Sequence, residues 1–322
     1  MKQPVPESIK NILVYSSDYQ TDLNKYGVKK DFALDRGARV LNQLKEDFGH
    51  EIPYLVPSKI SIPDILLVHD EEYLESLKNP ATWLSIFEFK ESEYDSNTAE
   101  KPLNMILEDF RIKTGGTKLA ATNALSHGLT ANLGGGYHHA FPAQGRGYCA
   151  INDIAISIRS LQKDKKIEKA LIVDLDFHQG DGNAFIFKED PSVFTLSVHS
   201  KEGWPEEKQK SDLDVNIPEG EEGTYIEKMN IGIERALNSF SPDLVFFVAG
   251  SDPYEKDILP GTRLLNLSLE QMKTRDKMVI DRFHELKIPL TIVFAGGYGP
   301  HVWEVHYHAI KHLLGKHCLI VG

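Results

Sequence analysis

Short, uniformly apolar segments recur along the chain, and segments with helical periodicity separate them. Strands in which nearly every residue is apolar are typical of parallel sheets buried on both faces. Parallel neighbours need crossover connections, which the intervening helical segments supply. The apolar segments are residues 12–15, 131–133, 170–173, 193–198, 244–248 and 290–295. The predicted helices are residues 70–78, 117–126, 152–162, 225–239, 268–286 and 301–314.

This alternation predicts an α/β fold with a central, mostly parallel sheet and helices on both faces. The chain has 322 residues and shows no linker, internal repeat or low-complexity tract, so we expect one domain over residues 1–322. A Gly-Gly turn at 115–116 is expected to precede the second helix. Two polar stretches, residues 88–102 and 200–223, are predicted to be surface loops that border a site.

Polar clusters follow four of the apolar segments, at the point where each predicted strand ends. In an open parallel sheet, ligands bind at the carboxyl ends of the strands. Four separate clusters at this one edge are hard to explain as turns, so the sequence predicts a catalytic site there. The clusters are GGGYHH (134–139), DLDFHQGDG (174–182), AGSD (249–252) and GGY (296–298).

One group of these residues has the composition of a metal site. Asp176 and His178 are two positions apart, so their side chains point to the same side of an extended segment. Together with Asp252 they offer one nitrogen and two oxygen ligands. Three protein ligands with an open position are typical of a catalytic zinc ion that activates water or polarises a carbonyl group.

The remaining polar residues of the clusters suggest acid–base chemistry. Asp174 and Asp181 are natural partners for the adjacent histidines His138 and His139, because a carboxylate orients an imidazole ring and raises its basicity. Tyr298 stands among glycines, where its hydroxyl can approach a developing oxyanion.

Five blocks resemble the signatures of zinc-dependent histone deacetylases, and most of the chain shares the resemblance. The likeness is closest to the class IV branch and to bacterial histone deacetylase-like amidohydrolases, which have the arginase/deacetylase fold. The blocks are GGGYHHA (134–140), GRGYCAIND (145–153), DLDFHQGDG (174–182), AGSD (249–252) and AGGYG (295–299).

The resemblance implies a role for each matching position. It implies one zinc ion per chain on Asp176, His178 and Asp252. It implies that His139, backed by Asp181, is the general base, that His138, backed by Asp174, is mainly electrostatic, and that Tyr298 donates to the oxyanion. It implies an acyl channel lined by Gly147, Tyr148 and Trp204. It implies a structural potassium ion held by Asp174, Asp176, His178, Ser197 and Val198, mostly through backbone carbonyls.

The expected activity is hydrolysis of the amide of an Nε-acyl-lysine, with acetyl or a longer acyl group. Two alternatives remain open: deacetylation of small acylated amines such as acetylpolyamines, and a non-catalytic module that binds acyl-lysine or acts as a scaffold. The net charge of −11 suits a cationic substrate and argues against nucleic acid as a partner.

The location and assembly of the chain are less constrained by the sequence. Cys149 and Cys318 cannot form a disulfide framework, and neither a signal peptide nor a membrane span is evident. We therefore expect a cytoplasmic protein. The sequence predicts no oligomeric state.

Overall fold

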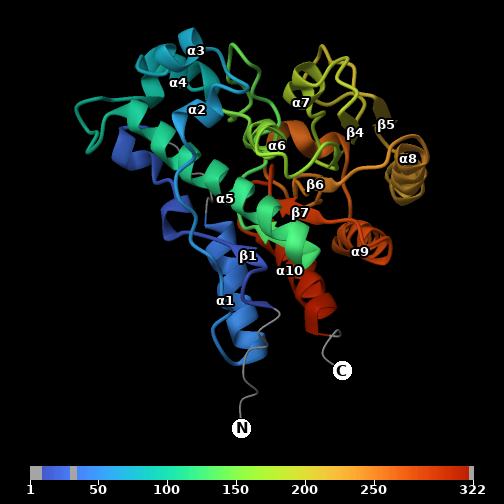
Figure 1. Cartoon of the computed structure of the whole chain (residues 1–322). Coiled ribbons are helices and arrows are strands. Elements are labelled where there is room, and N and C mark those ends of the chain that lie inside the picture. Colours follow the sequence, from blue (N-terminus) through green and yellow to red (C-terminus); the bar gives the residue numbers. More distant parts are fainter. Residues whose placement is uncertain (1–8, 30–34, 319–322) are drawn as a thin grey trace.

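The computed structural model describes residues 9–29 and 35–318. At its centre, seven strands of the described chain form one sheet in which every neighbouring pair is parallel (Figure 1). Their order across the sheet is β1-β2-β7-β6-β3-β4-β5. The strands are β1 (Leu13–Val14), β2 (Leu129–Asn132), β3 (Ala170–Asp174), β4 (Val193–Ser200), β5 (Leu213–Ile217), β6 (Leu244–Val248) and β7 (Leu290–Val293).

Six of these strands coincide with the six apolar segments, which confirms the predicted parallel sheet. The seventh, β5, lies inside the stretch 200–223, so the prediction that this whole stretch is a loop was wrong. Leu213, Val215 and Ile217 alternate with the polar residues Asp214 and Asn216. This alternation suits an edge strand, and among the described strands β5 pairs only with β4.

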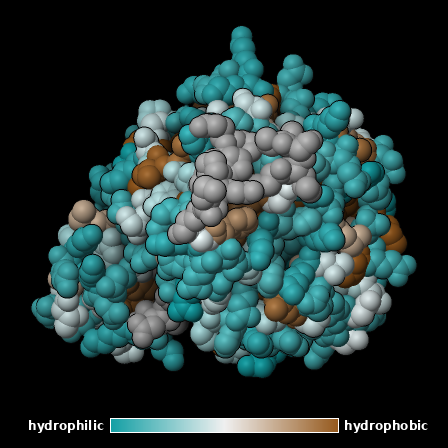
Figure 2. Space-filling view, turned by 90° about the horizontal axis from the view of Figure 1, so that it is seen from below, coloured by the Kyte–Doolittle hydropathy of each residue, from teal (hydrophilic) through white to brown (hydrophobic). Residues whose placement is uncertain are grey.

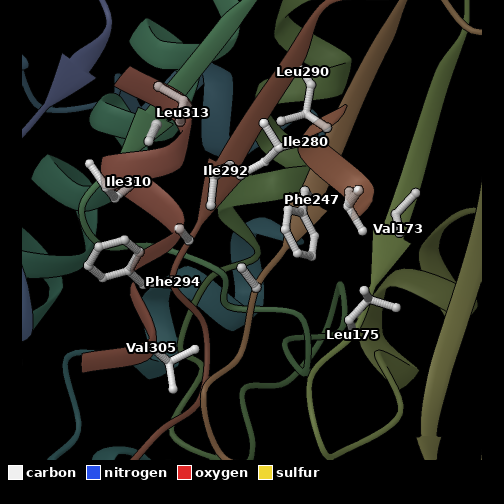
Figure 3. Packing of buried hydrophobic residues seen from close by; sticks show 14 of the residues in the cluster. Val173, Leu175, Phe247, Ile280, Leu290, Ile292, Phe294, Val305, Ile310 and Leu313 are labelled. Atoms are coloured by element: carbon white, nitrogen blue, oxygen red, sulfur yellow. The ribbon is translucent and has the colours of Figure 1, made fainter. Parts of the chain in front are cut away.

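Helices cover both faces of the sheet, as predicted. Alternate residues of β3, β6 and β7 pack against α1, α8, α9 and α10, and the intervening residues pack against α5, α6 and α7. Figure 3 shows Leu290 and Ile292 of β7, and Phe294 just beyond it, near Ile310 and Leu313 of α10. The bounds are α1 (Arg36–Phe48), α5 (Ile106–His127), α6 (Asp153–Lys163), α7 (Asp181–Ile186), α8 (Tyr225–Ser239), α9 (Leu269–Glu285) and α10 (Trp303–Cys318).

A second region, built from short helices, lies beyond one end of the sheet. The helices α2 (Ile62–Ile65), α3 (Glu71–Ser76) and α4 (Pro80–Ile86) gather at the upper left of Figure 1, above the start of α5. They have their own apolar cluster, in which Trp83 and Phe87 of the α4 segment pack on Phe110 of α5. This cluster supports one wall of the cavity described below.

The glycine pair Gly115–Gly116 lies inside a helix, so the predicted turn at this point was wrong. The helix α5 begins at Ile106 and runs through both residues. A Cβ atom on Gly116 would lie 1.8 Å from the Tyr19 hydroxyl oxygen, and one on Gly115 would lie 1.8 Å from the carbonyl oxygen of Ser58. The pair therefore permits close packing of α5 against its neighbours, which outweighs the weak helix propensity of glycine.

The described chain begins and ends at the end of the molecule where the strands begin (Figure 1). Figure 2 views the molecule from this end and shows a mainly hydrophilic surface with separate hydrophobic spots. Scattered spots of this kind are ordinary on protein surfaces. No helix within the described ranges has the length and apolar character needed to span a membrane. Residues 1–8, where a signal peptide would begin, and the side chain of Cys318 lie outside the described residues.

Candidate active site

The four polar clusters come from strands that are neighbours in the sheet. The strands β2, β7, β6 and β3 occupy consecutive positions, and each cluster follows the carboxyl end of one of them. Residues from all four segments border or lie beside one cavity of about 320 Å³. The sheet thus brings together side chains that are far apart in the sequence, from residue 134 to residue 298.

Asp176, His178 and Asp252 form a buried cluster with the composition of a metal site. One ligand atom from each lies within 4.8 Å of the others. The His178 Nδ1 atom lies 3.1 Å from Asp176 Oδ1 and 3.0 Å from Asp252 Oδ2. Backbone amides hold the carboxylates from behind, since Gly296 donates to Asp176 Oδ2 and Phe177 donates to Asp252 Oδ1.

The two adjacent histidines each form a pair with a different aspartate. The Nδ1 atom of His138 lies 2.8 Å from Asp174 Oδ2, and that of His139 lies 2.6 Å from Asp181 Oδ1. All four side chains are buried. Each carboxylate fixes the orientation of its imidazole ring and directs Nε2 away from the aspartate.

The surroundings move the pKa values of the two histidines in opposite directions. Burial lowers the pKa of His138, but the carboxylates of Asp174 and Asp176 outweigh it and raise that pKa to about 9. Burial and the charge of His138 lower the pKa of His139 to about 4. At neutral pH, His138 is therefore charged, whereas His139 is neutral and able to accept a proton.

Tyr298 lines the same cavity, and its loop is fixed by a buried carboxylate. The Tyr298 amide donates to Asp257 Oδ2 at 2.6 Å, and Asp257 Oδ1 accepts from the Leu259 amide at 2.8 Å. Burial, with further contributions from Asp252 and Asp176, raises the pKa of Tyr298 well above its usual value. The phenol thus stays protonated and remains a hydrogen-bond donor.

The three predicted channel residues also line the cavity, and all three are partly buried. Trp204 meets His139 edge to face, with the ring centroids 4.7 Å apart. Gly147 lies between them, and a Cβ atom there would be 2.8 Å from both His139 Cδ2 and Trp204 Cη2. Tyr148 completes the wall, 5.8 Å from the Tyr298 ring.

The residues predicted to hold potassium lie at the carboxyl ends of β3 and β4. Asp174 is paired in register with Ser197, and Val198 follows on β4. All five residues of the predicted set, which also includes Asp176 and His178, are buried. The potassium ion itself stays a prediction.

Several supporting residues were not assigned a role from the sequence. Asp153 accepts from the amides of Gly136 and Tyr137, at 2.9 and 2.7 Å, and so holds the loop that carries both histidines. Arg146 lies 3.4 Å from Asp181 Oδ2 and stacks over Trp204 at 4.6 Å. Both belong to the block 145–153, and its polar residues are the sequence feature from which their supporting roles could have been predicted.

Arg275 links the two segments that carry the metal cluster. It is 0% exposed on α9, and its Nη1 atom donates to the carbonyl oxygens of Leu175 and Gly250, at 3.0 and 2.7 Å. Its Nε atom donates to Asp276 Oδ1 at 2.8 Å, so the ion pair is buried as well. The sequence does not indicate this role, because a charged residue within a helical segment normally faces solvent.

We expect the substitution Arg275→Leu to lower the free energy of unfolding by about 3–5 kcal/mol, because it leaves the Asp276 carboxyl and two carbonyl groups buried without their partner. Chemical denaturation followed by circular dichroism measures this loss. The double variant Arg275→Leu/Asp276→Leu is expected to be more stable than the single variant. A loss below about 1 kcal/mol, which is typical of ordinary substitutions, would contradict this role.

The chain is similar in sequence to known proteins of one family. Residues 31–314 match the family model described as the histone deacetylase domain. An uncharacterized protein of Picosynechococcus is 42% identical over 200 residues, which cover 62% of this chain and 66% of that protein, just under two thirds of its length. Histone deacetylase 2 of Arabidopsis thaliana is 33% identical over 293 residues, which cover 89% of this chain and 74% of that protein.

A solved structure shares the fold at lower sequence identity. The crystal structure of acetylpolyamine aminohydrolase from Burkholderia pseudomallei superposes with a TM-score of 0.67 at 19% identity. The match covers 95% of this chain and 98% of that chain. At this level of identity the likeness establishes the shared architecture.

Proposed function

The chain belongs to the histone deacetylase family, and from this membership we propose that it hydrolyses the amide bond of Nε-acyl-lysine side chains. The observation that carries the proposal is the grouping of a three-residue metal cluster, two histidine–aspartate pairs and a protonated tyrosine around one cavity. These are the groups that amide hydrolysis requires: a site for a Lewis acid, a base and an oxyanion donor.

The side chains of Asp176, His178 and Asp252 are suitable ligands for zinc. One imidazole nitrogen and two carboxylates suit this ion, and three protein ligands leave a position open. Asp252 Oδ2 is buried and lies 3.0 Å from His178 Nδ1, so these two candidate ligand atoms converge as expected of atoms that a shared cation would hold together. Zinc bound here would activate a water molecule and polarise the substrate carbonyl group.

Three other residues would supply the acid–base catalysis and the stabilisation of charge. His139 donates its Nδ1 proton to Asp181, so Nε2 is free to remove a proton from the attacking water. The same atom afterwards returns a proton to the leaving lysine amine. His138 contributes positive charge, and the Tyr298 hydroxyl donates a hydrogen bond to the oxyanion.

A small acylated amine, such as an acetylpolyamine, is a second candidate substrate. Glu88 borders the cavity, and it is exposed to solvent beside Tyr148. A carboxylate at this position attracts the second amino group of a polyamine. A lysine within a peptide gains less from this carboxylate, because its backbone is neutral.

Hydrolysis of a substrate panel tests the proposal. The panel contains lysine peptides acylated with groups from acetyl to myristoyl, together with acetylputrescine. We expect turnover of acyl-lysine peptides by the zinc-loaded protein, its loss on chelation and its return with added zinc. Preference for acetylputrescine would favour the second candidate. Failure to hydrolyse any substrate, with one equivalent of zinc bound, would contradict both and favour binding of acyl-lysine without catalysis.

A further inference from the structure

The cavity extends inward, beyond the residues assigned to catalysis. At its mouth it is bordered by the exposed residues Glu88 and Gly261, whereas its inner part is bordered by the buried residues Tyr19, Thr21 and Lys113. A substrate that enters by the mouth presents its acyl group to this inner part, because the scissile amide lies at the metal cluster. The inner residues therefore face the acyl group.

Lys113 stands out among the inner residues because it carries a charge. Its side chain lies on α5 and is 7% exposed, and its Nζ atom donates to the Thr21 hydroxyl at 3.0 Å. No carboxylate of the described residues lies within ion-pair distance of this nitrogen. Asp109, one helical turn away, accepts a hydrogen bond from Tyr26 instead. An ammonium group can donate three hydrogen bonds, and buried ammonium groups are normally paired with an anion.

A second cation lies close to Lys113, and its own hydrogen bonds are made. Arg36 also lines the cavity and donates to the carbonyl oxygens of Ala295 and Gly296, at 2.7 and 2.8 Å. Burial, with a contribution from Arg36, lowers the pKa of Lys113 to about 8, so the ammonium form still predominates at neutral pH. The inner part of the cavity is thus positive, although the chain as a whole is acidic.

We propose that Lys113 binds a carboxylate at the far end of the substrate's acyl group, so that acyl groups derived from dicarboxylic acids, such as succinyl or glutaryl, are substrates. This inference rests on the proposed function. In the reaction, water adds to the amide carbon, the carbon–nitrogen bond breaks and the amine takes up a proton, so lysine and a dicarboxylate leave. A charge-assisted hydrogen bond between the carboxylate and the ammonium group supplies the selectivity. A long apolar acyl group would leave the ammonium group buried without an anion.

The test compares wild-type protein with Lys113→Met on peptides that carry succinyl-, pentanoyl- or acetyl-lysine. Pentanoyl resembles succinyl in length but has no charge. We expect wild type to favour succinyl over pentanoyl, and the substitution to lower this ratio of kcat/KM at least about tenfold, since hydrogen bonds to charged groups have this strength. Acetyl-lysine turnover, which reports on folding and on the proposed function, should remain unchanged. The control is Lys118→Met, which alters a lysine of the same helix that pairs with Asp64 at 3.3 Å.

Calorimetric titration with sodium succinate and with sodium acetate tests the same contact without turnover. We expect Lys113→Met to weaken succinate binding at least about tenfold and to leave acetate binding unchanged. Equal succinate affinity in both proteins, or an unchanged succinyl-to-pentanoyl ratio, would overturn the inference. Equal weakening of acetate and succinate would overturn it too, because Lys113 would then bind the released carboxylate product. If none of the acyl-lysine peptides is hydrolysed, the proposed function fails, while the titration still decides whether Lys113 binds the distal carboxylate.

Discussion

Substitution of His139 by alanine is expected to lower kcat about 10²–10⁴-fold, the range typical of a positioned general base. The structure provides the reason, because His139 is the neutral member of the histidine pair and its pKa is lowered to about 4 by burial and by His138. Its Nδ1 atom is bonded to Asp181, which leaves Nε2 as the proton acceptor. The loss should appear in kcat, with little change in KM, because proton transfer belongs to the transition state.

Zinc content and a second histidine variant separate this effect from structural damage. The His139→Ala protein should retain one equivalent of zinc, because His139 is not among the three clustered ligands. His308 on α10 lies outside the cavity lining, so His308→Ala should retain full activity. A loss of less than about fivefold in His139→Ala would exclude the general-base role, since that is well below the usual range.

The substitution Tyr298→Phe is expected to lower kcat about 10²–10³-fold, equivalent to about 2.7–4 kcal/mol of transition-state stabilisation. It removes one hydroxyl group and preserves the ring that packs near Tyr148. The hydroxyl is protonated because burial raises the pKa of Tyr298 well above its usual value. The hydrogen bond from this hydroxyl to the substrate strengthens as negative charge develops on the carbonyl oxygen. The substitution should therefore again affect mainly kcat.

Tyr307→Phe is a suitable control, because this substitution removes a tyrosine hydroxyl on α10, where it contacts Asp47. The control should have wild-type kinetics. If Tyr298→Phe were within about fivefold of wild type, the oxyanion would have to be stabilised without this donor. Crystallographic or spectroscopic evidence of an undisturbed zinc site would complete the comparison.

The central sheet and the polar clusters could be predicted because their sequence signal is local. A strand buried on both faces is an apolar run, and a polar cluster follows β3 and β6 directly and β7 after two residues. By contrast, β5 is only partly buried, so its alternating pattern within a polar stretch resembles a loop. The glycine pair in α5 was misjudged because its cause is a contact with Tyr19 and Ser58, distant in sequence.

The buried cations of the site could not be predicted for a related reason. Lys113 and Arg275 lie on helices, where a single charged residue normally faces solvent. Their burial follows from how α5 and α9 pack on the sheet, which no periodicity reveals. Lys113 donates to a hydroxyl group, and Arg275 donates to two backbone carbonyl oxygens and to the adjacent Asp276. These partners form no recognisable sequence motif.

The strand order has a consequence for how the protein is made. The last strand in the chain, β7, lies between β2 and β6, and it contributes the loop that carries Tyr298. During synthesis, the other six strands of the described sheet emerge from the ribosome before Leu290 does. Until then β2 has no partner on that side, and the metal cluster lacks the amide of Gly296. A nascent chain therefore cannot close the site early, and chains that terminate prematurely before this strand remain inactive.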